Sequence, residues 1–166
     1  LLQKAGVKTP VTVNMMVPNN PDTLQVAQVI QSMALEAGFN VKIQATEFAS
    51  SLQQSYDGNF EAYLIGWSGR IDIDGNTYAF LHSNQRNNVG NYSNPIVDKA
   101  LDDARLVTDI EQRNDQYATM WHQQRIDLPL LYLWTLKNTV GMTAKLTGFR
   151  PVPDGMIRLQ GLEMTK

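Results

Sequence analysis

The chain has 166 residues, of which 43% are hydrophobic and 18% charged, a composition typical of a globular domain with its own core. A formal net charge of −2 gives no positive footprint for nucleic acid or an anionic membrane surface, and no apolar run approaches the roughly 20 residues of a membrane span. The absence of cysteine excludes disulfides, thiolate catalysis and cysteine-ligated zinc.

The first residues, Leu-Leu-Gln-Lys-Ala-Gly, lack the basic start and the long apolar core of a signal peptide. They are typical of a helix end that stops at Gly6, since glycine commonly follows the last turn of a helix. We therefore expect the chain to be a fragment of a longer protein.

A strand, a helix and a second strand are predicted at the start of the chain. Residues 11–17 are rich in β-branched side chains and partly alternate, which predicts a strand. Asn20 and Pro21 are typical of a helix start, apolar residues then recur with helical spacing, and Gly38 provides the stop. Residues 41–45 alternate as a strand. The two strands should be parallel, because a helix between neighbouring strands makes a right-handed crossover.

Three further elements follow in the middle of the chain. Residues 48–56 predict a helix, and the apolar run at residues 63–65 predicts a third, buried strand. Asn94 and Pro95 repeat the cap-plus-proline pattern and open a helix to about Leu106.

The next helix is expected to begin with a capping box formed by Thr108 and Glu111 and to run towards Arg125. Residues 128–134 are apolar on both faces, which predicts a strand covered on both sides. Strands that alternate with helices in this way indicate an α/β fold, with a parallel or mixed sheet and flanking helices.

The candidate ligand site lies where the third strand ends, because α/β scaffolds commonly bind ligands at strand ends. A tryptophan offers a rigid aromatic face, although it can also anchor the core, and two small residues after it allow close approach to the backbone. An arginine follows, whose planar fork suits a carboxylate or phosphate. Two aspartates can bind a cation or orient that arginine. The candidate ligand-binding residues are Trp67, Ser68, Gly69, Arg70, Asp72 and Asp74.

Catalysis has little support in the sequence. Asp72 and Asp74 can form a glycosidase-like acid–base pair, but solvated turn carboxylates with this spacing are far commoner. The run from Asp72 also resembles a calcium loop, yet its sixth and twelfth positions hold Thr77 and Ser83 instead of Gly and Glu. The two histidines are far apart in sequence and fit no metal motif. We therefore expect no catalytic residue, no metal and no cofactor.

Gly-Trp-Ser-Gly at residues 66–69, followed by Asp-x-Asp and an aromatic stretch, is similar to a segment of a known receptor family. Further similarities lie at residues 1–7, 38–41, 91–95, 128–130 and 148–155. Together these motifs resemble the C-terminal part of dipeptide/oligopeptide-type (family 5) substrate-binding proteins of ABC importers. The resemblance extends over essentially the whole chain.

The resemblance implies a periplasmic receptor, or an extracytoplasmic lipoprotein, with two lobes that close over a ligand by a hinge. Residues 1–143 would form most of the second ligand-binding lobe, and residues 144–166 would return to the first lobe, which is missing. The partners would be a peptide or other small solute, the membrane permease of the transporter and that first lobe. In the family the tryptophan and the residues after it line the cleft, which carries over to Trp67, Ser68 and Gly69.

One position departs from the family pattern. Peptide-binding members place an aspartate just after this stretch to receive the amino group of the ligand, whereas this chain has Arg70. The loop is one residue shorter here, so Asp72 can also take that role. If Arg70 faces the ligand, a cationic terminus would be repelled. We then expect a ligand with an anionic or polyhydroxylated group at this end.

Two other functions remain open from the sequence. One is a small hydrolase that uses Asp72 or Asp74, and the other is a freestanding interaction domain with an exposed apolar patch. A catalytic role requires turnover that Asp72→Asn abolishes. An interaction domain requires a stable, monomeric 166-residue chain with no missing partner surface.

Overall fold

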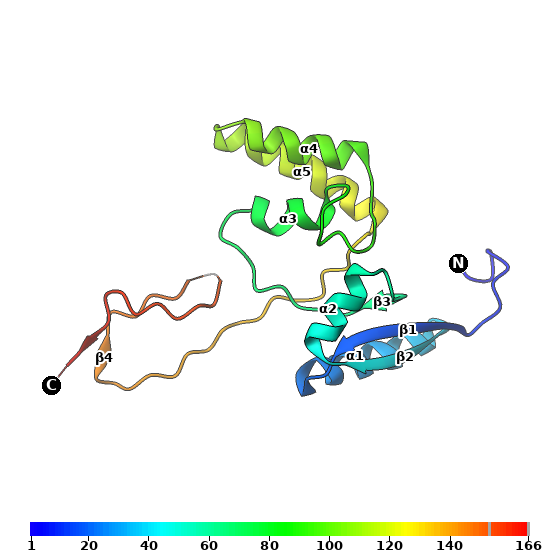
Figure 1. The fold of residues 1–166 in the computed structure, drawn as a ribbon, viewed down its shortest axis with the longest axis horizontal. Coiled ribbons are helices and arrows are strands. Elements are labelled where there is room, and N and C mark those ends of the chain that lie inside the picture. Colours follow the sequence, from blue (N-terminus) through cyan, green and yellow to red (C-terminus); the bar gives the residue numbers. More distant parts are fainter. Residues whose placement is uncertain (153, 166) are drawn as a thin grey trace. The chain divides into compact units, whose positions relative to one another are not determined.

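The computed structural model describes residues 1–152 and 154–165, and the chain divides into two compact units, Leu1–Trp67 and Ser68–Lys166 (Figure 1). The first unit is a three-stranded sheet with two helices, and the second contains three helices and an extended C-terminal segment.

The first unit is built around a βαβ element, as predicted. β1 (Val11–Pro18), α1 (Pro21–Glu36) and β2 (Phe39–Thr46) follow one another, and β1 pairs in parallel with β2 along its whole length. The sheet order is β2-β1-β3, so β1 is the central strand. The buried core of this unit comes from both strands and the helix between them: Met15, Val17, Ala27 and Val41.

The ends of α1 form as the sequence predicts. The Asn20 side chain accepts a hydrogen bond from the Thr23 N–H at 2.9 Å, which satisfies one of the free donors in the first turn. Pro21 occupies the first turn, where its missing N–H costs nothing. After the helix Gly38 has φ +90°, a conformation that side chains with a Cβ rarely adopt.

The third strand forms where expected but is shorter. α2 (Phe48–Tyr56) matches the predicted helix, and β3 (Ala62–Tyr63) pairs in parallel with β1. The Leu64 N–H still donates to the Met16 carbonyl at 3.0 Å, so the chain follows β1 for one more residue. It then leaves the sheet, and Ile65 is 40% exposed.

The second unit is a helical layer. α3 (Asp74–Leu81), α4 (Pro95–Leu106) and α5 (Ile110–Asp127) enclose one apolar cluster (Figure 1). Its buried members are Leu81, Val97, Ala100, Leu101, Ala104, Tyr117 and Met120. The start of α4 is confirmed, since the Asn94 side chain caps the Ile96 N–H at 2.9 Å. Helix α3 was not expected from the sequence.

Two sequence expectations in this unit are wrong. The cap of α5 is Asp109, whose carboxylate accepts from the Gln112 N–H at 2.9 Å, and not Thr108. No strand forms over residues 128–134. Leu128 instead ends α5 in a left-handed conformation (φ 50°), and a strand apolar on both faces needs a covering layer on each side. Leu131, which lies within residues 128–134, is 72% exposed and therefore largely uncovered.

The C-terminal segment carries a small antiparallel ladder. β4 (Leu146–Thr147) pairs with β5 (Glu163–Met164), and the Thr165 N–H donates to the Lys145 carbonyl at 2.8 Å. The division of the protein into a lobe at 1–143 and a returning segment at 144–166 stays a prediction.

Candidate ligand-binding site

The candidate loop begins directly after β3. Trp67 is the last residue of the first unit and is 47% exposed, and Ser68 opens the second unit and is exposed as well. Gly69 has φ +80°, which lets the chain turn towards α3 at this point. Arg70 is exposed, and its Nη1 donates to the Gly69 carbonyl at 2.7 Å and to the Ser68 hydroxyl at 3.2 Å.

Asn76, in the first turn of α3, holds the loop. Its Oδ1 accepts from the Arg70 N–H at 2.7 Å, and its Nδ2 donates to the carbonyls of Arg70 at 2.8 Å and of Asp72 at 2.9 Å. One amide side chain therefore satisfies three backbone groups of the loop, which a carboxylate cannot do because it has no donor. Sequence reasoning missed this role and read the residue only as part of a calcium-like run.

Gly75 makes room for Arg70. A Cβ at position 75 would lie 2.9 Å from both Cβ and Cγ of Arg70, closer than carbon atoms pack. The backbone of α3 therefore approaches the base of the arginine side chain in a way that only glycine permits. Gly75 and Asn76 together position the loop against α3.

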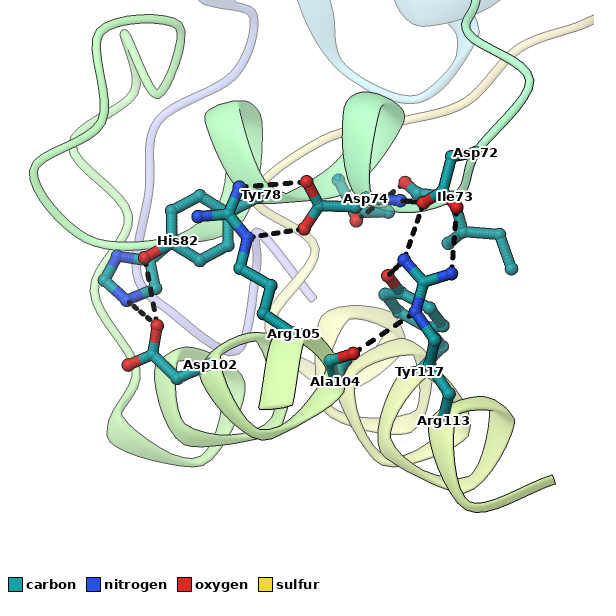
Figure 2. Close-up of polar contacts among 11 residues, drawn as sticks. Asp72, Ile73, Asp74, Tyr78, His82, Asp102, Ala104, Arg105, Arg113 and Tyr117 are labelled. Carbon is teal, nitrogen blue, oxygen red and sulfur yellow. Dashed lines mark hydrogen bonds and ion pairs between the residues drawn. The ribbon is translucent and has the colours of Figure 1, made fainter. Parts of the chain in front are cut away.

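Asp72 is paired with Arg113, from α5, in a bidentate arrangement (Figure 2). Nη1 and Nη2 of Arg113 donate to the two carboxylate oxygens at 2.8 and 2.7 Å, and the Asp74 N–H adds a third bond at 2.9 Å. The hydrogen bonds from Arg113 and then from the Asp74 backbone hold the pKa of Asp72 below its ordinary value, because both favour the charged form.

Asp74 forms a second bidentate pair, with Arg105 near the end of α4. Nε and Nη2 of Arg105 donate to its two oxygens at 2.7 and 2.9 Å (Figure 2). The Arg105 guanidinium carbon lies 3.2 Å from the centroid of the Tyr78 ring, and His82 stacks on that ring with centroids 4.4 Å apart. The His82 Nε2 lies 3.3 Å from a carboxylate oxygen of Asp102.

Both aspartates of the loop are thus paired with arginines from other helices. Asp72 pairs with Arg113 and Asp74 with Arg105, so these carboxylates join the loop and α3 to α4 and α5. Arg113 lies 41 residues after Asp72 and Arg105 lies 31 residues after Asp74, and no local sequence pattern marks either arginine.

Asp154, in the C-terminal segment, also interacts electrostatically with Arg70 of the loop. Arg158 chiefly lowers the pKa of Asp154 to about 2, and Arg70 adds a smaller effect.

The surface between these two ion pairs is an open depression of about 520 Å³ that both aspartates and both arginines line. Because each carboxylate is matched by its own guanidinium, the lining is balanced in charge. Among the described residues, no group of three or more acidic, histidine or cysteine side chains could hold a metal ion. Within the same residues no helix has the length and apolarity to cross a membrane.

Comparison with known proteins identifies the family. Residues 1–88 match the family described as "Bacterial extracellular solute-binding proteins, family 5 Middle". The chain belongs to this family. Relatives include a dipeptide-binding protein of Pseudomonas aeruginosa, 27% identical over 161 residues, which cover 92% of this chain and 30% of the relative. The glutathione-binding protein GsiB of Pectobacterium atrosepticum is 25% identical over an aligned stretch of 178 residues, which covers 100% of this chain and 34% of the length of GsiB.

Solved structures of this type confirm the predicted fold. Haemophilus influenzae OppA in complex with RPPGFSPFR is similar over 99% of this chain and 33% of its own length, with a TM-score of 0.84 at 24% identity. Bacillus subtilis AppA in complex with a nonapeptide is similar over 93% and 32%, with a TM-score of 0.80 at 23% identity. The chain spans about a quarter to a third of the length of the curated family relatives it matches.

Proposed function

We propose that this chain is part of the solute-binding component of an ABC importer, and that the loop after β3 contributes one wall of the ligand cleft. The observation that carries the proposal is the loop itself. It leaves the end of a parallel strand, is held in place by Asn76, and exposes Trp67, Ser68 and Arg70. Residues 1–143 would belong to the second lobe and residues 144–166 would return to the first.

The ligand would be a peptide or a related small polar solute. The relatives are named for binding dipeptides, oligopeptides and glutathione, which are all small and rich in backbone-type hydrogen-bonding groups. Arg70 stands where peptide-binding members are expected to carry an aspartate. A guanidinium at that point repels an ammonium group and attracts an anion, so we propose a ligand with an anionic or polyhydroxylated group at this end.

The partners and the location follow from the same role. A solute-binding component delivers its cargo to a membrane permease, and the family description itself is extracellular. We therefore propose that the whole protein works outside the cytoplasm, in the periplasm or as a lipoprotein. The relatives are named as binding proteins, and we propose that this protein likewise has no catalytic activity. A hydrolase would need Asp72 or Asp74 to exchange protons, but both are held by bidentate arginines.

The test is calorimetry on the full-length protein with three probes that differ only at the amino end: trialanine, N-acetyl-trialanine and N-succinyl-trialanine. We expect the succinyl peptide, which carries an extra carboxylate, to bind roughly tenfold more tightly than the acetyl peptide. Arg70→Ala should remove that difference. Tight binding of unblocked trialanine that Arg70→Ala leaves unchanged would contradict the proposed ligand chemistry.

A further inference from the structure

Two carbonyl groups of the candidate loop accept from the same side-chain nitrogen. The Nδ2 of Asn76 donates to the Arg70 carbonyl at 2.8 Å and to the Asp72 carbonyl at 2.9 Å. Both carbonyls therefore point towards the first turn of α3, where Asn76 lies. The N–H on the other side of each of these peptide groups belongs to the next residue, Ile71 in one case and Ile73 in the other.

The geometry of the peptide group fixes the direction of these two N–H groups. The cis peptide bond among the described residues is Thr9–Pro10, so the peptide groups that join residues 70 to 71 and 72 to 73 are trans. In a planar trans peptide group the C=O and the N–H point in opposite directions. The N–H groups of Ile71 and Ile73 therefore point away from Asn76.

These two N–H groups are open to a ligand. Within the described residues, neither the Ile71 N–H nor the Ile73 N–H has a hydrogen-bond partner. Ile71 is 74% exposed and Ile73 is 40% exposed, so water can satisfy both groups until a ligand replaces it. The groups that fit an N–H are oxygen acceptors, such as a peptide carbonyl or a carboxylate.

We propose that the N–H groups of Ile71 and Ile73 are a pair of backbone donors for oxygen acceptors of the ligand, and that Asn76 is the positioning residue that turns them outward. This inference rests on the proposed role of the loop in ligand binding. It does not depend on the charge of Arg70, because a neutral peptide carbonyl is a sufficient acceptor.

Further contacts hold the same stretch of backbone in place. The Oδ1 of Asn76 accepts from the Arg70 N–H at 2.7 Å. The Asp72 carboxylate is paired with Arg113 and also accepts from the Asp74 N–H at 2.9 Å. Because the backbone is ordered before binding, a ligand that uses the two donors loses little conformational freedom of the loop.

The experiment follows the two amides by NMR in full-length protein labelled with ¹⁵N-isoleucine, with N-acetyl-trialanine as the probe. Ile71→Val and Ile73→Val assign the two signals, because each variant lacks one of them. Without the probe, we expect both amides to exchange with solvent at unprotected rates. With the probe at saturation, both signals should shift and their exchange should slow about threefold to tenfold.

Variants of Asn76 test the positioning role. Asn76→Ala releases both carbonyls, so it should weaken the binding of N-acetyl-trialanine about threefold to tenfold and abolish the slower exchange of both amides. Asn76→Asp keeps an acceptor for the Arg70 N–H but has no donor, so it should behave like Asn76→Ala. Asn20→Ala is the matched control, because Asn20 also bonds the backbone at the start of a helix. It should leave the affinity and both amides unchanged.

Several results would overturn the inference. Protection of either amide in the ligand-free protein would show that the group is already bonded inside the molecule. Wild-type binding by Asn76→Asp would show that the carbonyls need not be held. An equal loss of affinity in Asn20→Ala would reduce the effect of Asn76 to general stability.

Failure of the proposed function can be told apart from failure of this inference. If the probe shifts the indole N–H signal of Trp67 but neither isoleucine amide, the loop binds ligand and only the inference is wrong. If the probe binds and none of these signals responds, the proposed role of the loop is contradicted as well. A probe that does not bind contradicts both, because a neutral carbonyl is the acceptor assigned to these donors.

Discussion

Gly75→Ala tests how the loop is positioned, and its effect can be worked out from the structure. The added Cβ would lie 2.9 Å from Cβ and Cγ of Arg70, whereas carbon atoms pack at about 3.5 to 4.0 Å, so the two segments must separate by roughly 0.6 to 1.1 Å. Crowding of this kind costs about 1 to 3 kcal/mol. Alanine in a helix gains up to about 1 kcal/mol over glycine, so the net destabilisation is about 0 to 3 kcal/mol.

The assay is hydrogen exchange of the α3 amides in the full-length protein, which reports the local free energy of opening. A double-mutant cycle with Arg70→Gly provides the control, because glycine at position 70 removes both atoms that clash. In that background we expect Gly75→Ala to stabilise α3 by up to about 1 kcal/mol, a reversal of sign. The same destabilisation in both backgrounds would refute the reasoning. Gly75→Ala alone should also weaken the preference for the succinyl peptide.

Two further predictions concern stability. Asp109→Ala should destabilise α5 by about 1 kcal/mol because the Gln112 N–H loses its acceptor, whereas Thr108→Ala should change little; equal losses in urea unfolding would show that the cap is misassigned. Arg113 lowers the pKa of Asp72 in the folded protein. The ion pair therefore stabilises the folded state at pH values above the unfolded pKa of about 3.9. This contribution is lost as the pH falls through the lower pKa of the folded state. Asp72→Asn should therefore flatten the pH dependence of unfolding below about pH 4, and an unchanged profile would contradict this sign.

Local signals explain which parts of the fold could be predicted. Asn20, Pro21 and Gly38 each act on the backbone within a few residues, and they bound α1 as expected. Helix α3 was missed because it has little amphipathic pattern. Its buried positions are Thr77 and Leu81, and its packing depends on α4. The predicted strand over residues 128–134 failed because an apolar run also requires neighbouring layers to cover it.

The candidate site likewise has a part that local sequence could predict and a part that depends on distant residues. The residue types of the loop indicated recognition chemistry, and the candidate residues at positions 67–70 do lie on one continuous loop. The state of the aspartates could not be predicted, because their partners Arg105 and Arg113 come from helices far along the chain. The ligand contacts of all six candidate residues stay predictions.

The central claim is that this loop belongs to a solute receptor whose ligand carries an anionic or polyhydroxylated group where Arg70 lies. The most direct measurement is mass spectrometry of the solute that co-purifies with the full-length protein, followed by the same analysis of Arg70→Ala. We predict a bound solute with such a group, and its loss from the variant. Recovery of ordinary unblocked di- and tripeptides, equally from both proteins, would contradict it.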